Sequence, residues 1–170
     1  YGNVHGTQCA ELILAMVPNV ELFLCRIEPS QDISQIKGLI SNLTKALRWL
    51  IEEVEVDIIS ASLSHDLRSG HINTNASELA DSAELLSLLT EERFFICSID
   101  NSLTGERPKG ELWPAFLGRD NAQVLAVGGY QRNTLDEREF HTGLNSPYLD
   151  FLAPSIEFGA VTSFRRPSFW

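Results

Sequence analysis

The spacing of apolar residues along the chain predicts its main helices and strands. Apolar residues recur at steps of three and four over 34–54 and over 77–90, which predicts two helices that each bury one face. Shorter apolar runs predict strands at 56–63, 94–99, 124–129 and 148–154. The run at 94–99 is apolar throughout, which is typical of a strand buried on both faces. Because strands and helices alternate, we expect an α/β fold, with a mainly parallel sheet and helices on both faces.

The first 27 residues predict a further helix and strand. Thr7 is a candidate N-cap, and the apolar residues that follow fit one buried helical face. These residues are Leu12, Ile13, Ala15, Met16 and Val17. Pro18 and Asn19 interrupt the pattern, and residues 20–27 then predict a strand. A histidine at the mouth of this helix, His5, stands one residue before a glycine, which indicates a role other than packing.

Composition and charge narrow the class of partner. The formal net charge is −10, which argues against a general nucleic-acid partner because phosphate binding needs a basic patch. No apolar run reaches the roughly 18–20 residues needed to span a membrane. The carboxylates are scattered rather than gathered in one loop, so we expect no cofactor or metal, and calcium stays an open alternative.

The cysteines carry a weak signal about the compartment. There are three, Cys9, Cys25 and Cys97, and an odd count without short spacing argues against a disulfide framework or a zinc site. Cys25 and Cys97 lie in apolar runs, so we expect buried thiols. Free thiols lean towards a reducing compartment such as the cytoplasm.

Five blocks of sequence resemble, in order, the subtilisin-like serine peptidases, and together they cover essentially all 170 residues. The blocks are His5-Gly6-Thr7 with its helix, the helix and strand over 46–63, the strand and asparagine over 94–101, the proline turn and strand over 113–129, and the strand over 149–154. The resemblance implies one partial peptidase domain over 1–170, a three-layer α/β/α fold that is incomplete at both ends.

In that family a Ser-His-Asp triad cleaves peptide bonds. The resemblance implies that His5 is the general base and that Asn101 is the oxyanion donor. It also implies that Ser62, Leu63 and Ser64 form the edge that pairs with an extended polypeptide substrate. The family's aspartate lies upstream of the histidine and its serine lies in a Gly-Thr-Ser-Met-Ala motif, which this chain lacks, so we expect both outside the 170 residues. By themselves these residues are then expected to be marginally stable and without peptidase activity.

Simpler interpretations stay open. His5 by itself fits a surface or core histidine, Asn101 fits a turn residue, and 62–64 fits a plain strand end. Within the matched blocks, Gln8 replaces a histidine of the family, and Glu11 and Asp100 replace glycines. Ser64 and Ser155 also replace glycines, as the remaining departures from the family pattern.

These departures favour an alternative function. In it, the domain is catalytically degenerate and binds an extended peptide or a partner protein. A nucleotide-binding doubly wound domain is a third, weaker alternative, because no glycine-rich turn follows the first strand.

Overall fold

The computed structural model describes residues 5–27, 39–66, 76–99, 112–132, 138–140 and 146–154. The helical elements are α1 (His5–Met16), α2 (Leu39–Arg48), the π-helical turn η2 (Trp49–Val54), α3 (Ala76–Ser87) and the 3-10 helix η3 (Ala115–Arg119). The strands are β1 (Ile58–Ala61), β2 (His65–Asp66), β3 (Phe94–Ser98), β4 (Leu112–Trp113), β5 (Val124–Arg132), β6 (Arg138–Phe140) and β7 (Phe151–Pro154).

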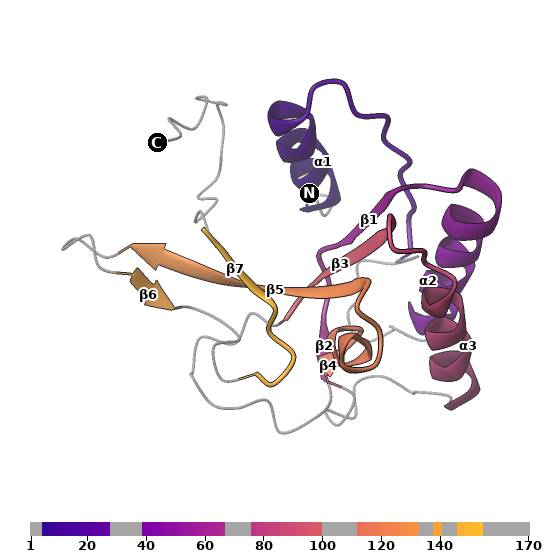
Figure 1. Cartoon of the computed structure of the whole chain (residues 1–170). Coiled ribbons are helices and arrows are strands. Elements are labelled where there is room, and N and C mark those ends of the chain that lie inside the picture. Colours follow the sequence, from indigo (N-terminus) through magenta and orange to yellow (C-terminus); the bar gives the residue numbers. More distant parts are fainter. Residues whose placement is uncertain are drawn as a thin grey trace.

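Four parallel strands form the centre of the molecule, in the order β1-β3-β5-β7 (Figure 1). Residue 61 of β1 stands opposite residue 97 of β3, and residue 97 opposite residue 126 of β5. The strand β6 pairs antiparallel with the far end of β5, and β2 pairs with β4 in a separate two-stranded sheet. The prediction of an α/β fold with a mainly parallel sheet is confirmed.

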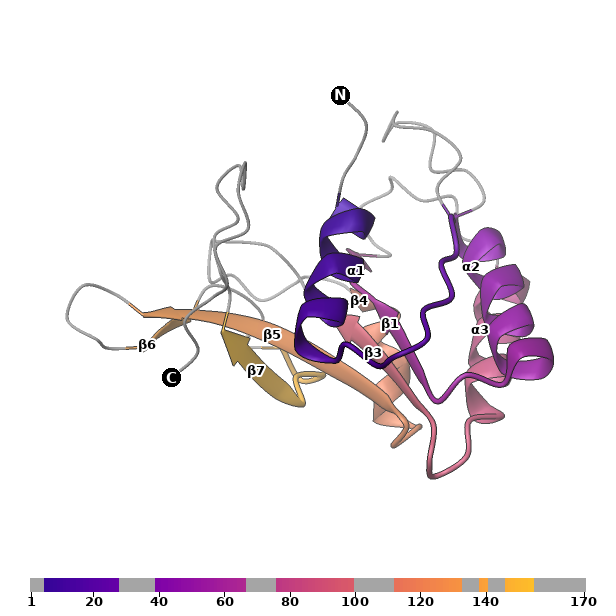
Figure 2. The ribbon, with the colours of Figure 1, turned by 90° about the horizontal axis from the view of Figure 1, so that it is seen from above.

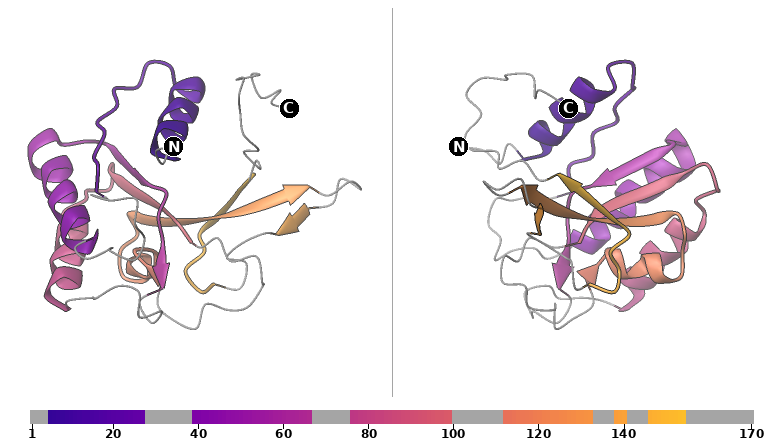
Figure 3. Two further views of the ribbon diagram at one scale, coloured as in Figure 1. Left: turned by 180° about the vertical axis from the view of Figure 1, so that it is seen from behind. Right: turned by 60° about the vertical axis from the view of Figure 1, so that its left-hand side comes forward.

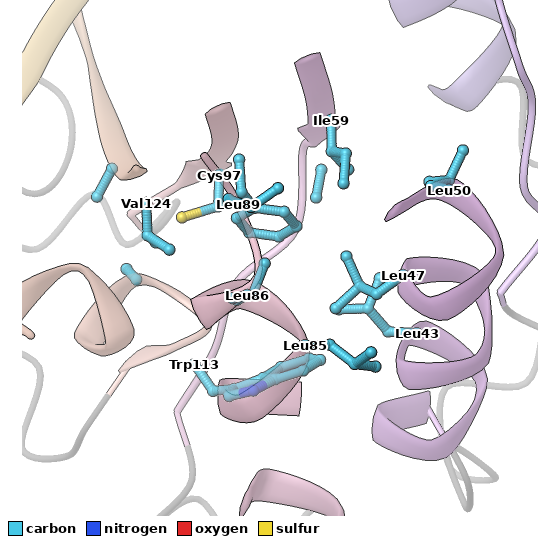
Figure 4. Packing of buried hydrophobic residues seen from close by; sticks show 14 of the residues in the cluster. Leu43, Leu47, Leu50, Ile59, Leu85, Leu86, Leu89, Cys97, Trp113 and Val124 are labelled. Carbon is cyan, nitrogen blue, oxygen red and sulfur yellow. The ribbon is translucent and has the colours of Figure 1, made fainter. Parts of the chain in front are cut away.

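One face of the sheet carries the hydrophobic core. The strands alternate, so that every second side chain points to this face, where α2, α3, β4 and η3 cover it. The buried residues include Ile59, Ala61, Phe95, Cys97, Val124 and Ala126 from the sheet, Leu43, Leu47, Leu50, Leu85, Leu86 and Leu89 from the α2 and α3 regions, and Trp113 and Ala115 from β4 and η3. Figure 4 shows Leu43 and Leu47 pointing toward Leu85. We call this the packed face.

The opposite face of the sheet, the open face, is covered far less. Its side chains include Ile58, which is 60% exposed, and Phe94 and Ile96, which are half-buried. The helix α1 lies on this side of the sheet, away from α2 and α3 (Figures 1 and 3), and contains no buried residue. The prediction that 94–99 is buried on both faces is therefore wrong, because α1 leaves Phe94 and Ile96 partly in contact with water.

One side chain in the connection between η3 and β5, that of Asn121, holds the edge of the packed face in place. The Asn121 amide donates to the Leu86 carbonyl near the end of α3 at 2.9 Å, and its carbonyl oxygen accepts from the Gln123 amide at 3.0 Å. One asparagine thereby ties the last turn of α3 to the start of β5. The sequence pattern gave no sign of this contact, since loop residues have no period.

The N-terminal region differs most from its sequence pattern. The expected buried face of α1 is wrong, because Met16 and Val17 are exposed and only Leu12 and Ile13 of that set are half-buried. The strand expected over 20–27 is also wrong: this segment is extended but carries no sheet pairing, and Leu24 is 75% exposed. An apolar pattern does not supply the neighbouring strand that a ladder of hydrogen bonds requires.

Two local features of the helices differ from the sequence pattern. The prediction that Thr7 is an N-cap is wrong, because α1 begins at His5. Trp49, which follows α2, is 36% exposed and packs edge-on against Phe23, with ring centroids 6.1 Å apart. The wider π-helical turn beginning at Trp49 shifts the side-chain period at the end of the long helix.

Candidate functional site

The site forms where α1 meets the carboxyl end of β1. His5 is the first residue of α1, and Ser62 directly follows the last residue of β1. The His5 Nε2 atom lies 3.4 Å from the Ser62 carbonyl oxygen, across 57 residues of sequence. Two segments that the sequence nominated separately are therefore brought together (Figure 2). In α/β folds, ligands bind at the carboxyl ends of parallel strands, which is where this contact lies.

A third side chain, Cys9, completes the cluster. Residues four apart share one side of a helix, so the Cys9 thiol lies beside the His5 ring. The Cys9 Sγ atom is 3.8 Å from His5 Nε2 and donates a hydrogen bond to Ser62 Oγ at 3.6 Å. His5 and Ser62 are exposed and Cys9 is half-buried, so the cluster is open to solvent. An imidazole, a thiol and a hydroxyl together supply groups that can accept and donate hydrogen bonds.

The segment 62–64 turns away from the sheet immediately after β1. The Leu63 amide donates to the Ala61 carbonyl at 2.6 Å, so that amide is taken up within the turn. Leu63 is half-buried and packs against the core cluster, whereas the side chain of Ser62 is exposed. Leu63 therefore anchors the segment, and Ser62 presents its carbonyl to His5 and its hydroxyl to Cys9.

Asn101, the predicted oxyanion donor, and the neighbouring Asp100 lie outside the described residues, as does Ser155. The strand that precedes Asn101 is in place: β3 runs parallel to β1, and the Ile99 amide donates to the Val127 carbonyl of β5 at 3.1 Å. Of the other departures from the family pattern, Gln8 is half-buried and Glu11 is exposed on α1.

The other two cysteines have environments unlike that of Cys9. Cys97 is buried in β3, and burial together with the charge of Asp150 raises the pKa of its thiol from 9.0 to about 12. Desolvation also raises the pKa of the Cys25 thiol. The expectation that Cys97 is buried is confirmed, and the same expectation for Cys25 is wrong, because Cys25 is exposed in the unpaired segment 20–27.

Asp150 has a structural role as well. Its carboxylate accepts a hydrogen bond from the Ala126 amide at 2.7 Å, and its own amide donates to the Ala126 carbonyl at 3.0 Å. This pair of bonds joins β7 to β5 just below the parallel pairing of the two strands. The carboxylate is therefore engaged with backbone rather than with the His5 cluster.

Sequence reasoning did not single out Cys9 as a site residue. The signal was present, because a cysteine four residues after a histidine shares its side of a helix once the helix is predicted. What the spacing does not reveal is that Ser62 lies within reach of both side chains. That proximity depends on how α1 sits over the sheet.

Within the described ranges, no group of three or more His, Cys, Asp or Glu side chains could hold a metal ion. Over the same residues, none of the helices has both the length and the apolar character needed to cross a membrane. In comparisons with known proteins, no family model and no curated protein matches this chain.

Proposed function

We propose that this chain is part of a subtilisin-like serine endopeptidase domain, with His5 as its general base. The observation that carries the proposal is the 3.4 Å contact between His5 Nε2 and the Ser62 carbonyl. It joins the predicted base to the predicted substrate-binding edge, at the carboxyl end of a parallel strand. A base beside an edge that pairs with an extended polypeptide is the arrangement that peptide-bond cleavage requires.

In the proposed reaction, His5 takes the proton of a serine hydroxyl while the serine oxygen attacks the scissile carbonyl. His5 then gives the proton to the leaving amine, and water releases the acyl group by the same steps in reverse order. The serine and the aspartate that orients His5 would come from sequence outside the 170 residues. Asn101 would donate to the oxyanion, and residues 62–64 would hold the substrate backbone.

A second function is favoured by a specific observation. Nε2 of His5, the atom that a general base must keep available, already contacts both Ser62 and Cys9. A domain that has lost catalysis would be free to keep these contacts. In this alternative the domain binds an extended peptide or partner protein at the edge formed by 62–64 and performs no chemistry.

A serine-directed fluorophosphonate probe separates the two functions. The protein encoded by the complete reading frame is labelled as wild type, as His5→Ala and as Leu14→Ala. Leu14 is the matched control, because it is exposed on the same helix. For a peptidase, His5→Ala lowers the labelling rate about 10²–10⁴-fold, since that is what a general base contributes, and Leu14→Ala leaves the rate unchanged. A folded wild-type protein that stays unlabelled, or labelling that ignores His5, would contradict the peptidase and favour the binding module.

A further inference from the structure

Two contacts of the His5 ring, with Ser62 and with Cys9, bear on which ring nitrogen carries the proton. A carbonyl oxygen only accepts hydrogen bonds, so the contact between Nε2 and the Ser62 carbonyl needs a hydrogen on Nε2. The Cys9 thiol uses its one hydrogen toward Ser62 Oγ, and its sulfur then faces Nε2 as a second acceptor at 3.8 Å. The Ser62 carbonyl oxygen and the Cys9 sulfur therefore both face Nε2 as acceptors.

We propose that Cys9 is a positioning residue for His5, and that its sulfur and the Ser62 carbonyl together hold the imidazole as the Nε2–H tautomer. We call these two contacts the latch. The hydrogen bond from Cys9 to Ser62 Oγ is essential to it, because this bond keeps the thiol hydrogen away from Nε2. The hydroxyl of Ser62 thus sets the direction of the thiol, and the thiol sets the tautomer of the ring.

The latch has a consequence that rests on the proposed function. A neutral imidazole carries one N–H, so the Nε2–H tautomer leaves Nδ1 as the basic nitrogen. A triad histidine accepts the serine proton at Nε2 while its Nδ1–H is held by a carboxylate. The latched ring is the opposite tautomer and therefore a resting state. An extended polypeptide that donates an N–H to the Ser62 carbonyl competes for the same acceptor, so substrate binding would release the base.

Three substitutions separate the parts of the latch. Cys9→Ala removes the sulfur acceptor, whereas Cys9→Ser keeps one donor and one acceptor at the same place. Ser62→Ala keeps the backbone carbonyl but frees the thiol hydrogen, which can then turn toward Nε2. Cys25→Ala is the matched control, because it removes an exposed thiol from the segment 20–27.

The test is a long-range proton–nitrogen NMR spectrum of the chain labelled with ¹⁵N-histidine, and it needs no turnover. The buffer is set about one pH unit above the ordinary histidine pKa of about 6.5, so that most rings are neutral while a thiol with the ordinary pKa of about 8.5 keeps its hydrogen. The His5→Gln variant identifies the His5 signals among those of the four histidines. Amide spectra of each variant check that the fold is retained.

We expect wild type, Cys9→Ser and Cys25→Ala to show the Nε2–H tautomer. In Cys9→Ala, losing one contact of ordinary hydrogen-bond strength lowers the Nε2–H to Nδ1–H ratio about 2- to 10-fold. In Ser62→Ala the ratio falls further, because the thiol hydrogen now competes at Nε2. A wild-type ring with Nδ1–H, or ratios that neither substitution changes, would overturn the latch.

The latch and the peptidase fail in different ways. An Nε2–H tautomer that depends on Cys9, in a protein that no fluorophosphonate labels, would support the latch and contradict the peptidase. Labelling that depends on His5, in a protein whose resting ring carries Nδ1–H, would support the peptidase and contradict the latch.

Discussion

Phe94 and Phe95 are neighbours in β3, yet they have different environments. Phe95 is fully buried on the packed face, under α2, α3 and η3, and Phe94 is half-buried on the open face. The open face is also the side on which α1 brings His5 to the end of β1. The packed face therefore supplies most of the hydrophobic stabilisation, and the open face carries the polar cluster. Stability and candidate chemistry lie on opposite sides of one sheet.

The largest effect is expected from the two phenylalanines. Phe95→Ala leaves a cavity under the helices and costs about 3–5 kcal/mol of unfolding free energy. Phe94→Ala removes a half-exposed side chain and costs about 1 kcal/mol. Urea denaturation of both variants measures the difference in unfolding free energy as a shift of the midpoint. Phe95→Ala could also fail to fold at all, which is the extreme form of the same result. Equal losses would mean that the open face is as well packed as the other.

The second effect depends on pH and concerns Cys97 on the packed face. Its pKa is raised from 9.0 to about 12, so between these values the unfolded chain loses a proton that the folded chain keeps. The stability that this thiol contributes is complete below pH 9.0 and is lost as the pH rises toward about 12. Denaturation midpoints across this range are expected to fall less steeply in Cys97→Ala.

The control for this prediction is Cys25→Ala, which removes the exposed thiol. In this variant the denaturation midpoint should fall with rising pH nearly as steeply as in wild type. If the denaturation midpoint falls equally steeply with pH in wild type and in Cys97→Ala, the Cys97 thiol titrates with its ordinary pKa.

A smaller effect is expected from two glycines in contrasting regions. An added Cβ at Gly118, in η3, would lie 2.7 Å from the Val124 carbonyl oxygen, so Gly118→Ala forces the backbone to shift. Overpacking of this kind costs about 1–3 kcal/mol. At Gly6 in α1, nothing lies within 4 Å of the added atom, and alanine favours a helix by up to about 1 kcal/mol. Thermal unfolding should therefore move in opposite directions for the two variants.

The smallest effect is expected in the segment 20–27. Leu24 is 75% exposed, so Leu24→Ala should change the unfolding free energy by less than about 0.5 kcal/mol. The same truncation at Leu47, buried in α2, should cost about 2–5 kcal/mol. A large loss at Leu24 would show that this segment is covered in solution by something that contacts its apolar side chains.

The sequence predicted the packed face well, because that face is built from periodic patterns. The helix over 77–90 and the four apolar runs correspond to α3, β1, β3, β5 and β7, within a few residues at their ends. The open face was not predictable in the same way. An apolar residue such as Ile58 or Leu24 shows only that burial would be favourable, and whether another element covers it depends on tertiary packing.

The candidate site was predictable only in part. The nomination of His5 and Ser62 came from the family resemblance, and no period or spacing relates two residues that are 57 positions apart. Cys9 was missed because its role depends on the Ser62 hydroxyl as well as on its helical spacing from His5. Asn101 lies outside the described residues and stays a prediction.

The absence of buried residues in α1 has an evolutionary consequence. Substitutions in a core are removed by selection because they unfold the protein, whereas most exposed substitutions change stability by less than about 0.5 kcal/mol. The outward positions of α1 can therefore diverge freely while the sheet and its leucine-rich helices stay constrained. A library that randomises Leu14, Ala15 and Met16 should yield mostly folded proteins. New binding preferences on the exposed side of α1 can thus be selected without redesigning the rest of the molecule.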